Sequence, residues 1–359
     1  MAAAKFARTT GNWAVNGNWS NVSCAAAGAT TFPTAADDVT ICDGIGITVA
    51  AGTPAAANSV QFQTGATATS LTLNANLTVS TNLTLNASTA AVTRQIVVSA
   101  GQTLAVTGNV TVNGGTTTAN AANISQIAVG TGVMTVGGTM NITAGSVTSN
   151  ARVTLTTGRI TVTGNTTLTG GTAAGRNALL TVGGLPAVGG NGINLNGDLT
   201  LTSTVATTAQ VTTTVAGSVI NVAGNVSNGD TITVSTGIFN ATGAAKTFTT
   251  TNTSIVTSTT VATPGQLNIT GNMTVQGGSL ASSSASVTGT TGAIAITGNA
   301  TVTGGAFNAS SATLSVTTGT LTIGGTLGIT GGTVATSNAT VSVSTGRSEE
   351  HTSELQSQR

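Results

Sequence analysis

Few side chains in this sequence are able to carry out acid–base or nucleophilic chemistry. Before residue 347 the chain has five aspartates, Asp37, Asp38, Asp43, Asp198 and Asp230, and it has neither glutamate nor histidine there. Glycosidic cleavage usually needs two carboxylates close together, and a serine or threonine nucleophile needs a histidine partner for a catalytic triad. Asp198 and Asp230 each follow a glycine at an expected bend, and we interpret Asp198 as a corner residue. We therefore predict a protein that is not an enzyme and has no cofactor.

The N-terminal segment holds the remaining candidates for a ligand site or a cross-link. Asp37, Asp38 and Asp43 form a weak calcium candidate together with backbone carbonyls, although their spacing matches no established loop and aspartates are also ordinary turn residues. Cys24 and Cys42 are the two cysteines of the chain. They predict a disulfide formed in an oxidising compartment, with two small buried thiols as the alternative. A structural zinc site needs four ligands, which two cysteines without histidine do not supply.

Internal repeats define the elements that position these residues. Segments 266–292, 293–319 and 320–346 align without a gap at 27 residues, and they place Ile269, Ile296 and Ile323 in one column. Within each repeat, apolar residues alternate with Thr, Ser and Asn over short runs separated by glycine-containing bends, which is typical of half-buried strands. We predict an all-β fold, a three-sided parallel β-solenoid (β-helix) with ~27-residue coils and an N-terminal cap. An antiparallel sandwich or propeller also explains the alternation, but it does not require the 27-residue spacing.

The chain is expected to have three parts. Residues 1–58 form an N-terminal cap, in which Trp13, Trp19 and Phe32 close the open end of the core, since an exposed first coil presents unpaired backbone groups. Residues 59–346 form the solenoid, about ten coils at ~4.8 Å per coil or a rod about 50 Å long. The register is irregular around 228–264, where we expect an irregular coil or an outward loop. Residues 347–359 form a separate charged tail.

The composition excludes several classes of protein. Hydrophobic residues make up 39% of the chain, too many for a simple disordered linker, while charged residues make up 5% and aromatic residues 2%. There is no apolar run of the ~20 residues that a membrane span needs. Nucleic-acid binding is not expected, because the bases in the repeats are scattered and no aromatic residues are interleaved with them. These bases are Arg94, Arg152, Arg159, Arg176 and Lys246.

One strand of each C-terminal repeat is predicted to present hydroxyl groups to solvent at two-residue spacing. On a flat face they form a lattice of roughly 4.8 by 6.8 Å, similar to the threonine arrays of ice-binding β-solenoids. Serine and threonine are also ordinary polar residues of solvated strands, and this is the alternative interpretation. The residues of this possible binding face are Ser286, Thr288, Thr290, Thr313, Ser315, Thr317, Thr340, Ser342 and Ser344.

Three segments resemble known sequences. Residues 11–13 (GNW), 17–20 (GNWS), 32–41 (FPTAADDVTI) and 43–44 (DG) are similar to the module found ahead of many bacterial surface solenoids. The repeats resemble, in style and composition, those of secreted bacterial adhesins of the filamentous-haemagglutinin and autotransporter kind. Residues 347–359 resemble a translated sequencing adapter. This last resemblance implies a metagenomic fragment whose natural sequence continues beyond residue 346.

Together these observations predict a non-catalytic, extracellular structural or adhesive repeat region of a bacterial surface protein, secreted or at the cell surface. A stiff multivalent rod of this kind is expected to bind cell-surface glycans or neighbouring copies of itself through many weak contacts. The alternatives are an ice-binding solenoid that uses the outward hydroxyl array, and a non-catalytic fragment of a polysaccharide-active enzyme.

Overall fold

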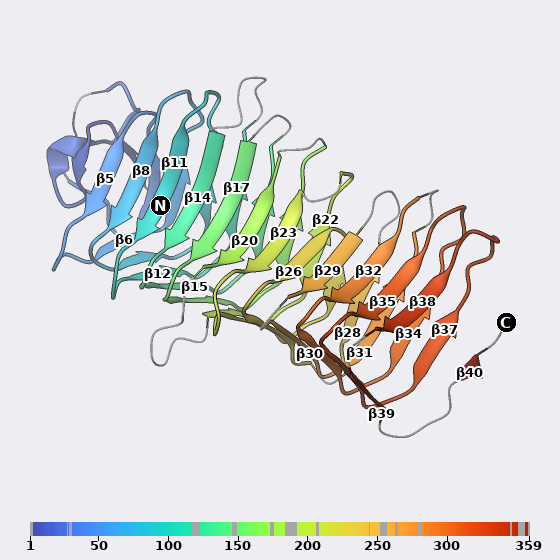
Figure 1. Ribbon diagram of the computed structural model, residues 1–359. Coiled ribbons are helices and arrows are strands. Elements are labelled where there is room, and N and C mark those ends of the chain that lie inside the picture. Colours follow the sequence, from blue (N-terminus) through green and yellow to red (C-terminus); the bar gives the residue numbers. More distant parts are fainter. Residues whose placement is uncertain are drawn as a thin grey trace. The chain divides into compact units, whose positions relative to one another are not determined.

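The computed structural model describes residues 3–26, 28, 31–115, 123–145, 149–172, 176–183, 192–205, 208–243, 245–251, 257–262, 265–278, 282–344, 347–350 and 356–357. Within these ranges the regular structure is almost entirely β-strand, with one short 3-10 helix, η1 (Asn16–Asn18). The chain divides into two compact units, and Figure 1 shows that both consist of β-strands. Unit 1 comprises Met1–Leu180 and Pro186–Asn191, and unit 2 comprises Thr181–Leu185 and Gly192–Arg359.

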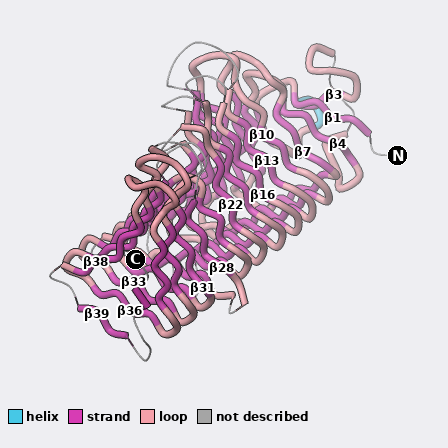
Figure 2. Tube along the Cα trace, turned by 90° about the vertical axis from the view of Figure 1, so that its right-hand side faces the viewer, coloured by secondary structure: helices cyan, strands magenta, loops and turns pink. Residues whose placement is uncertain are grey.

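Unit 1 is built from three parallel sheets, named A, B and C in the order in which the chain visits them; Figure 2 shows the labelled strands of sheet A from β1 to β16. Sheet A contains β3 (Trp19–Ser20), which is antiparallel to its neighbour, and the parallel strands β1 (Ala3–Ala7), β4 (Asp37–Ile41), β7 (Ser59–Phe62), β10 (Leu83–Leu85), β13 (Val110–Asn113), β16 (Met140–Thr143) and β19 (Thr166–Thr169). Sheet B contains β2 (Gly11–Asn12), β5 (Gly46–Val49), β8 (Thr69–Leu73), β11 (Thr93–Val98), β14 (Asn123–Val129) and β17 (Ser149–Leu155). Sheet C contains β6 (Ala55–Ala57), β9 (Leu77–Val79), β12 (Thr103–Val106), β15 (Val133–Val136) and β18 (Arg159–Val162).

Unit 2 has the same three-sheet arrangement, and β20 (Ala178–Val182) spans the division between the units. Its sheet A contains β22 (Leu199–Thr202), β25 (Val226–Asn228), β28 (Thr247–Thr251), β31 (Asn272–Gln276), β34 (Ala300–Thr303), β37 (Leu327–Thr330) and β40 (Gln356–Ser357). Its sheet B contains β23 (Ala209–Thr213), β26 (Thr231–Val234), β29 (Thr257–Val261), β32 (Ala285–Gly289), β35 (Ala312–Val316) and β38 (Ala339–Val343). Its sheet C contains β21 (Gly192–Leu195), β24 (Val219–Val222), β27 (Ile238–Ala241), β30 (Gln266–Ile269), β33 (Ala293–Ile296), β36 (Thr320–Ile323) and β39 (Arg347–Glu350).

The predicted fold class is confirmed: the chain is a three-sided parallel β-solenoid with coils of about 27 residues. The apolar column of the repeats lies in the core, since Ile269, Ile296 and Ile323 are 2%, 1% and 4% exposed. Full burial of such a side chain contributes about 1.5–3 kcal/mol. At the next corner the amide of Gly298 donates to the carbonyl of Gly271 at 3.1 Å. A Cβ atom at residue 298 would approach that carbonyl too closely, so the corner requires glycine.

The irregular register around 228–264 corresponds to a shortened coil. In sheet C, Asn221 pairs with Asn240 only 19 residues later, and in sheet A Val226 pairs with Phe248. Only Gly229 and Asp230 connect β25 to β26, where other coils have a longer bend between sheets A and B. The ladders therefore continue through the described part of this region, and the irregularity lies in the length of the bend.

The N-terminal cap is shorter than the predicted residues 1–58. Strands β4, β5 and β6, all before residue 58, already pair in parallel with β7, β8 and β9. In β4 the inward residues Val39 and Ile41 are fully buried, so this segment has the alternation of a coil strand. The cysteines, tryptophans and aspartates made its composition look different without changing that alternation.

Two tryptophans close the N-terminal end of unit 1. Trp13 and Trp19 are 2% and 0% exposed, and their rings pack edge to face with centroids 5.0 Å apart. The indole of Trp19 donates to the carbonyl of Trp13 at 2.7 Å, and β3 (Trp19–Ser20), at the edge of sheet A, pairs antiparallel with β1. Phe32 does not join them, because its side chain is 40% exposed. Our expectation that Phe32 helps to close the core is therefore wrong.

Candidate functional site

The three N-terminal aspartates do not converge on one point. Asp37 and Asp38 are consecutive residues of a strand, so their side chains point to opposite faces of the sheet, and Asp37 is buried while Asp38 is half-exposed. In the part of the chain that the structure describes, no three Asp, Glu, His or Cys side chains gather as a metal site would require. Their carboxylates instead accept hydrogen bonds from different segments: Asp37 from Thr34, Asp38 from Asn58 and Ser59, and Asp43 from Ala66 and Thr67.

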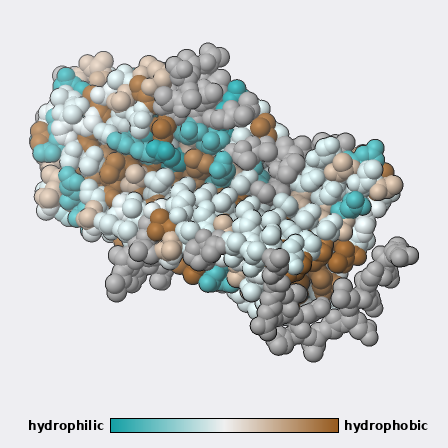
Figure 3. Space-filling model, viewed as in Figure 1, coloured by the Kyte–Doolittle hydropathy of each residue, from teal (hydrophilic) through white to brown (hydrophobic). Residues whose placement is uncertain are grey.

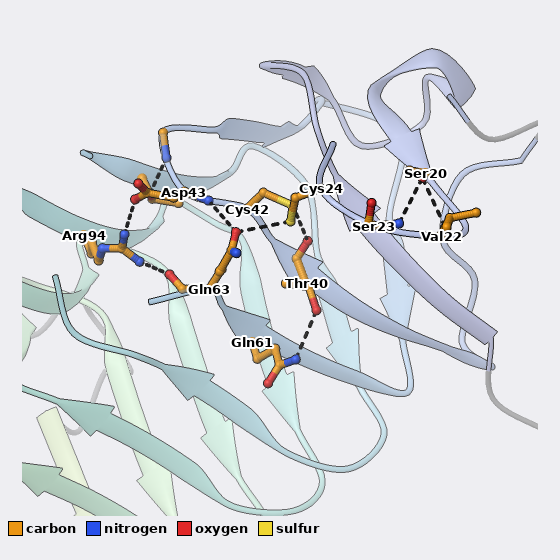
Figure 4. Close-up of a disulfide and its surroundings, with 12 residues drawn as sticks. Ser20, Val22, Ser23, Cys24, Thr40, Cys42, Asp43, Gln61, Gln63 and Arg94 are labelled. Carbon is orange, nitrogen blue, oxygen red and sulfur yellow. Dashed lines mark hydrogen bonds and ion pairs between the residues drawn. A yellow bond between two sulfur atoms is a disulfide. The ribbon is translucent and has the colours of Figure 1, made fainter. Parts of the chain in front are cut away.

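Asp43 forms an ion pair with a buried arginine. The guanidinium of Arg94 contacts the carboxylate of Asp43 and donates to the carbonyl of Gln63, and its side chain is 0% exposed (Figure 4). Burial lowers the pKa of Arg94, and the charge of Asp43 opposes this shift. Asp43 also accepts the amides of Ala66 and Thr67 at 3.1 and 3.0 Å. This carboxylate is thus committed to holding three coils together, which argues against the calcium hypothesis.

A disulfide joins Cys24 and Cys42 beside this ion pair (Figure 4). The Cα atoms are 5.8 Å apart, inside the range that a disulfide allows. Gln63 Oε1 lies 3.2 Å from the Cys24 sulfur and accepts the amide of Asp43 at 3.2 Å. The disulfide therefore ties the cap to the first coil at the point where Arg94 ties that coil to the third.

Asp198 has the structural role that we expected of it. At one corner of several coils an asparagine Oδ1 accepts the backbone amide of the equivalent residue in the next coil, as Asn272 does from Asn299 at 2.9 Å and Asn299 from Thr326 at 2.9 Å. Asp198 accepts the amide of Asn225 in the same way at 2.7 Å. Its carboxylate replaces the amide oxygen of the column.

Asp230 lies inside the solenoid, at the bend of the shortened coil. Its side chain is fully buried, and its Oδ2 accepts the amides of Thr208 and Ala209 at 2.9 and 2.6 Å. The neighbouring Asn228 is also fully buried and donates to the Thr259 hydroxyl at 2.9 Å. These contacts tie the shortened bend to Thr208 and Ala209 of the preceding coil and to Thr259 of the following coil. A buried carboxylate engaged in this way has no access to a bulky substrate.

The predicted hydroxyl face exists on sheet B of unit 2. Strands β32, β35 and β38 pair so that equivalent residues are in register, with their outward side chains half-exposed or exposed. The hydroxyls of Ser315 and Thr288 are 3.4 Å apart, and the Thr290 hydroxyl donates to the carbonyl of Val261 in the preceding coil at 3.4 Å. The ladders are Ser286–Thr313–Thr340, Thr288–Ser315–Ser342 and Thr290–Thr317–Ser344.

Sheet C of unit 2 carries an asparagine ladder that the sequence analysis missed. One outward residue in each of β21, β24, β27 and β30 is an asparagine, and all four asparagines are half-exposed. Each Nδ2 donates to the Oδ1 of the preceding coil at 2.8–2.9 Å. The series is Asn194, Asn221, Asn240 and Asn268. Their separations of 27, 19 and 28 residues hide this column from any search at a constant period.

A neutral groove of about 400 Å³ lies in unit 1, at the carboxyl ends of successive strands of sheet A. Asn113 Nδ2 donates to Asn86 Oδ1 there at 3.3 Å. Small residues form the rest of the floor, and Gly114 admits no side chain because a Cβ atom would collide with the amide of Gly145. The lining residues are Thr64, Asn86, Ala87, Asn113, Gly114, Thr143, Ala144 and Gly145.

Comparison with known proteins adds no family to this description. No family model matches the chain, and neither the curated proteins nor the solved structures yield a match. Among the described residues, no helix has the length and apolar character needed to cross a bilayer. The fold and its surfaces define the class, a β-solenoid repeat protein with ladders of neutral polar side chains.

Proposed function

We propose that this chain is a non-catalytic, extracellular structural or adhesive region of a bacterial surface protein. The observation that carries the proposal is the stacking of outward amides and hydroxyls in register, as in the asparagine ladder of β21, β24, β27 and β30. Within each ladder, successive coils offer the same kind of weak hydrogen-bonding group at ~4.8 Å intervals. A stiff multivalent solenoid of this kind gains affinity for an extended partner by adding weak contacts.

The chemistry of these surfaces favours cell-surface glycans or neighbouring copies of the chain as partners. Amides and hydroxyls form hydrogen bonds with hydroxyl-rich ligands, and the chain has a net charge of only +1. Low charge also reduces repulsion between neighbouring copies. The disulfide between Cys24 and Cys42 supports a secreted or cell-surface location, because such bonds persist in oxidising compartments.

The absence of catalysis is supported by the positions of the aspartates. Asp43 is paired with Arg94, Asp198 accepts a backbone amide at a corner, and Asp230 is buried. The test is to incubate the full chain with immobilised polysaccharides and with whole bacterial cells, and to measure retention and release of reducing ends in the same samples. We expect retention without release. Cleavage that disappears in Asp198→Ala or Asp230→Ala would contradict the proposal and favour the polysaccharide-active alternative.

Ice binding is the second candidate, and the hydroxyl face on sheet B of unit 2 favours it. Thr288, Ser315 and Ser342 are stacked in register on three successive strands. Their mixed identity argues against ice binding, because serine and threonine present different surfaces. Thermal hysteresis of the full chain decides between the two functions. Hysteresis that is abolished by tyrosine at these three positions would establish ice binding, whereas adhesion predicts none.

A further inference from the structure

A second polar row lies on sheet B of unit 1, where β11, β14 and β17 pair in register. Gln95 pairs with Gln126, and Gln126 pairs with Arg152, so three long polar side chains stand side by side on the outward face. All three are half-exposed. Figure 3 shows hydrophilic side chains in a row over these strands, with apolar surface beside them. Two half-exposed apolar neighbours are Val97 and Ala128, which are paired on β11 and β14.

Hydrogen bonds orient the arginine of this row. Arg152 Nε donates to Gln126 Oε1 at 2.7 Å, and Gln126 Nε2 donates to Gln95 Oε1 at 2.7 Å. Within the part of the chain that the structure describes, Nη1 and Nη2 of Arg152 have no protein partner. The glutamines thus hold the guanidinium in place by one nitrogen and leave the other two free to bind.

The charge of Arg152 is not neutralised by the protein. The ion pair found among the described residues joins Asp43 to a different arginine, Arg94, whose side chain is buried. Partial burial lowers the pKa of Arg152, but a guanidinium stays protonated in proteins. An oriented, partly desolvated cation with two free donors has the geometry for bidentate binding of a carboxylate.

We propose that the row Gln95–Gln126–Arg152 binds an acidic polysaccharide, with a sugar carboxylate on Nη1 and Nη2 of Arg152. The side-chain amide of Gln95 donates a hydrogen bond to a hydroxyl group further along the polysaccharide. Val97 and Ala128 pack against the apolar face of a sugar ring. This inference rests on the proposed function and adds the ligand class. A single cation flanked by amides fits a ligand that is bound through one carboxylate and several hydroxyls, whereas nucleic-acid affinity comes from several phosphate contacts.

The test uses polygalacturonate and its fully methyl-esterified form, which share a backbone and differ in charge. We expect the full chain to bind the acid form at least tenfold more tightly than the ester. Arg152→Gln should lose about 10–100-fold of that affinity, as expected for hydrogen bonds to a charged group. The matched control is Arg159→Gln, which removes the same charge from an exposed residue of β18 on sheet C and should change affinity less than twofold.

A second variant separates binding from folding. Gln126→Met keeps the charge of Arg152 but removes the acceptor that orients it, so affinity for polygalacturonate should fall several-fold with an unchanged circular dichroism spectrum. Equal losses in Arg152→Gln and Arg159→Gln, equal binding of acid and ester, or stronger binding of oligothymidylate than of polygalacturonate would overturn the inference. If the chain binds neutral glycans or cells but does not bind polygalacturonate, the inference is overturned and the proposed function stays intact. Failure to bind any glycan, any cell or another copy would defeat the proposed function itself.

Discussion

Removing the carboxylate of Asp43 should destabilise unit 1 more than any other single charge change in the chain. In Asp43→Ala, the guanidinium of Arg94 stays buried and charged but loses its counter-ion. Its side chain is 0% exposed and that of Asp43 is 28% exposed. Breaking a buried pair from one side costs about 3–5 kcal/mol. The partial exposure of Asp43 places the expected loss in free energy of unfolding at about 3 kcal/mol.

Hydrogen exchange and chemical denaturation together measure this effect. The amides of Ala66 and Thr67 lose their acceptor in Asp43→Ala, so their protection should fall along with the denaturation midpoint of unit 1. The double variant Asp43→Asn with Arg94→Met removes both charges and should recover most of the loss, because replacing a whole buried pair is often nearly neutral. Asp198→Asn removes one charge at a corner and should change stability by less than about 0.5 kcal/mol.

Two results would refute the reasoning. One is a loss below about 1 kcal/mol in Asp43→Ala, which would place Arg94 in contact with water instead of in the core. The other is a double variant as unstable as the single one, since the cost would then come from packing or from the Ala66–Thr67 turn and not from an unpaired charge.

Three further perturbations test the architecture. Replacing both Cys24 and Cys42 by serine should lower the free energy of unfolding by about 3 kcal/mol, as expected for a closed loop of this length. The denaturation midpoint of this variant should equal that of the wild type after reduction of its disulfide. Gly319→Ala should cost about 1–3 kcal/mol in a thermal melt, because its Cβ would collide with the carbonyl of Gly292; an unchanged melting temperature would contradict the corner stacking. Asp230→Ala should cost about 2 kcal/mol by leaving buried amides without an acceptor, with no change in glycan binding.

The fold was predictable because its signals are local and repeated. The alternation of apolar and polar residues and the 27-residue period place Ile269, Ile296 and Ile323 in the core without reference to distant contacts. The cap boundary was less predictable, since cysteines and tryptophans changed the composition of a segment whose strands already belong to the solenoid. Phe32 illustrates the same difficulty, because residue type alone does not determine whether an aromatic side chain near the end of the core packs into the core.

The surfaces were harder to predict than the core. A constant period finds the hydroxyl ladders of 286–344, but it misses Asn221 and Asn240, which are 19 residues apart because a bend is shortened. Gln95, Gln126 and Arg152 are separated by 31 and 26 residues, so only the strand pairing brings them together. In the sequence, Arg94 is one of several scattered basic residues. Its side chain points inward because the alternation of outward and inward residues in β11 begins with an outward Thr93.

Affinity as a function of ligand length tests the central claim most directly. Oligosaccharides of a polysaccharide that the chain retains are titrated against it by calorimetry, from a fragment that contacts one coil to one that spans many coils. Multivalent ladders predict a dissociation constant that falls by about 10²–10⁴ over this series, with every oligosaccharide recovered intact. A dissociation constant that is independent of length, or oligosaccharides that are shortened during the titration, would contradict a non-catalytic multivalent solenoid.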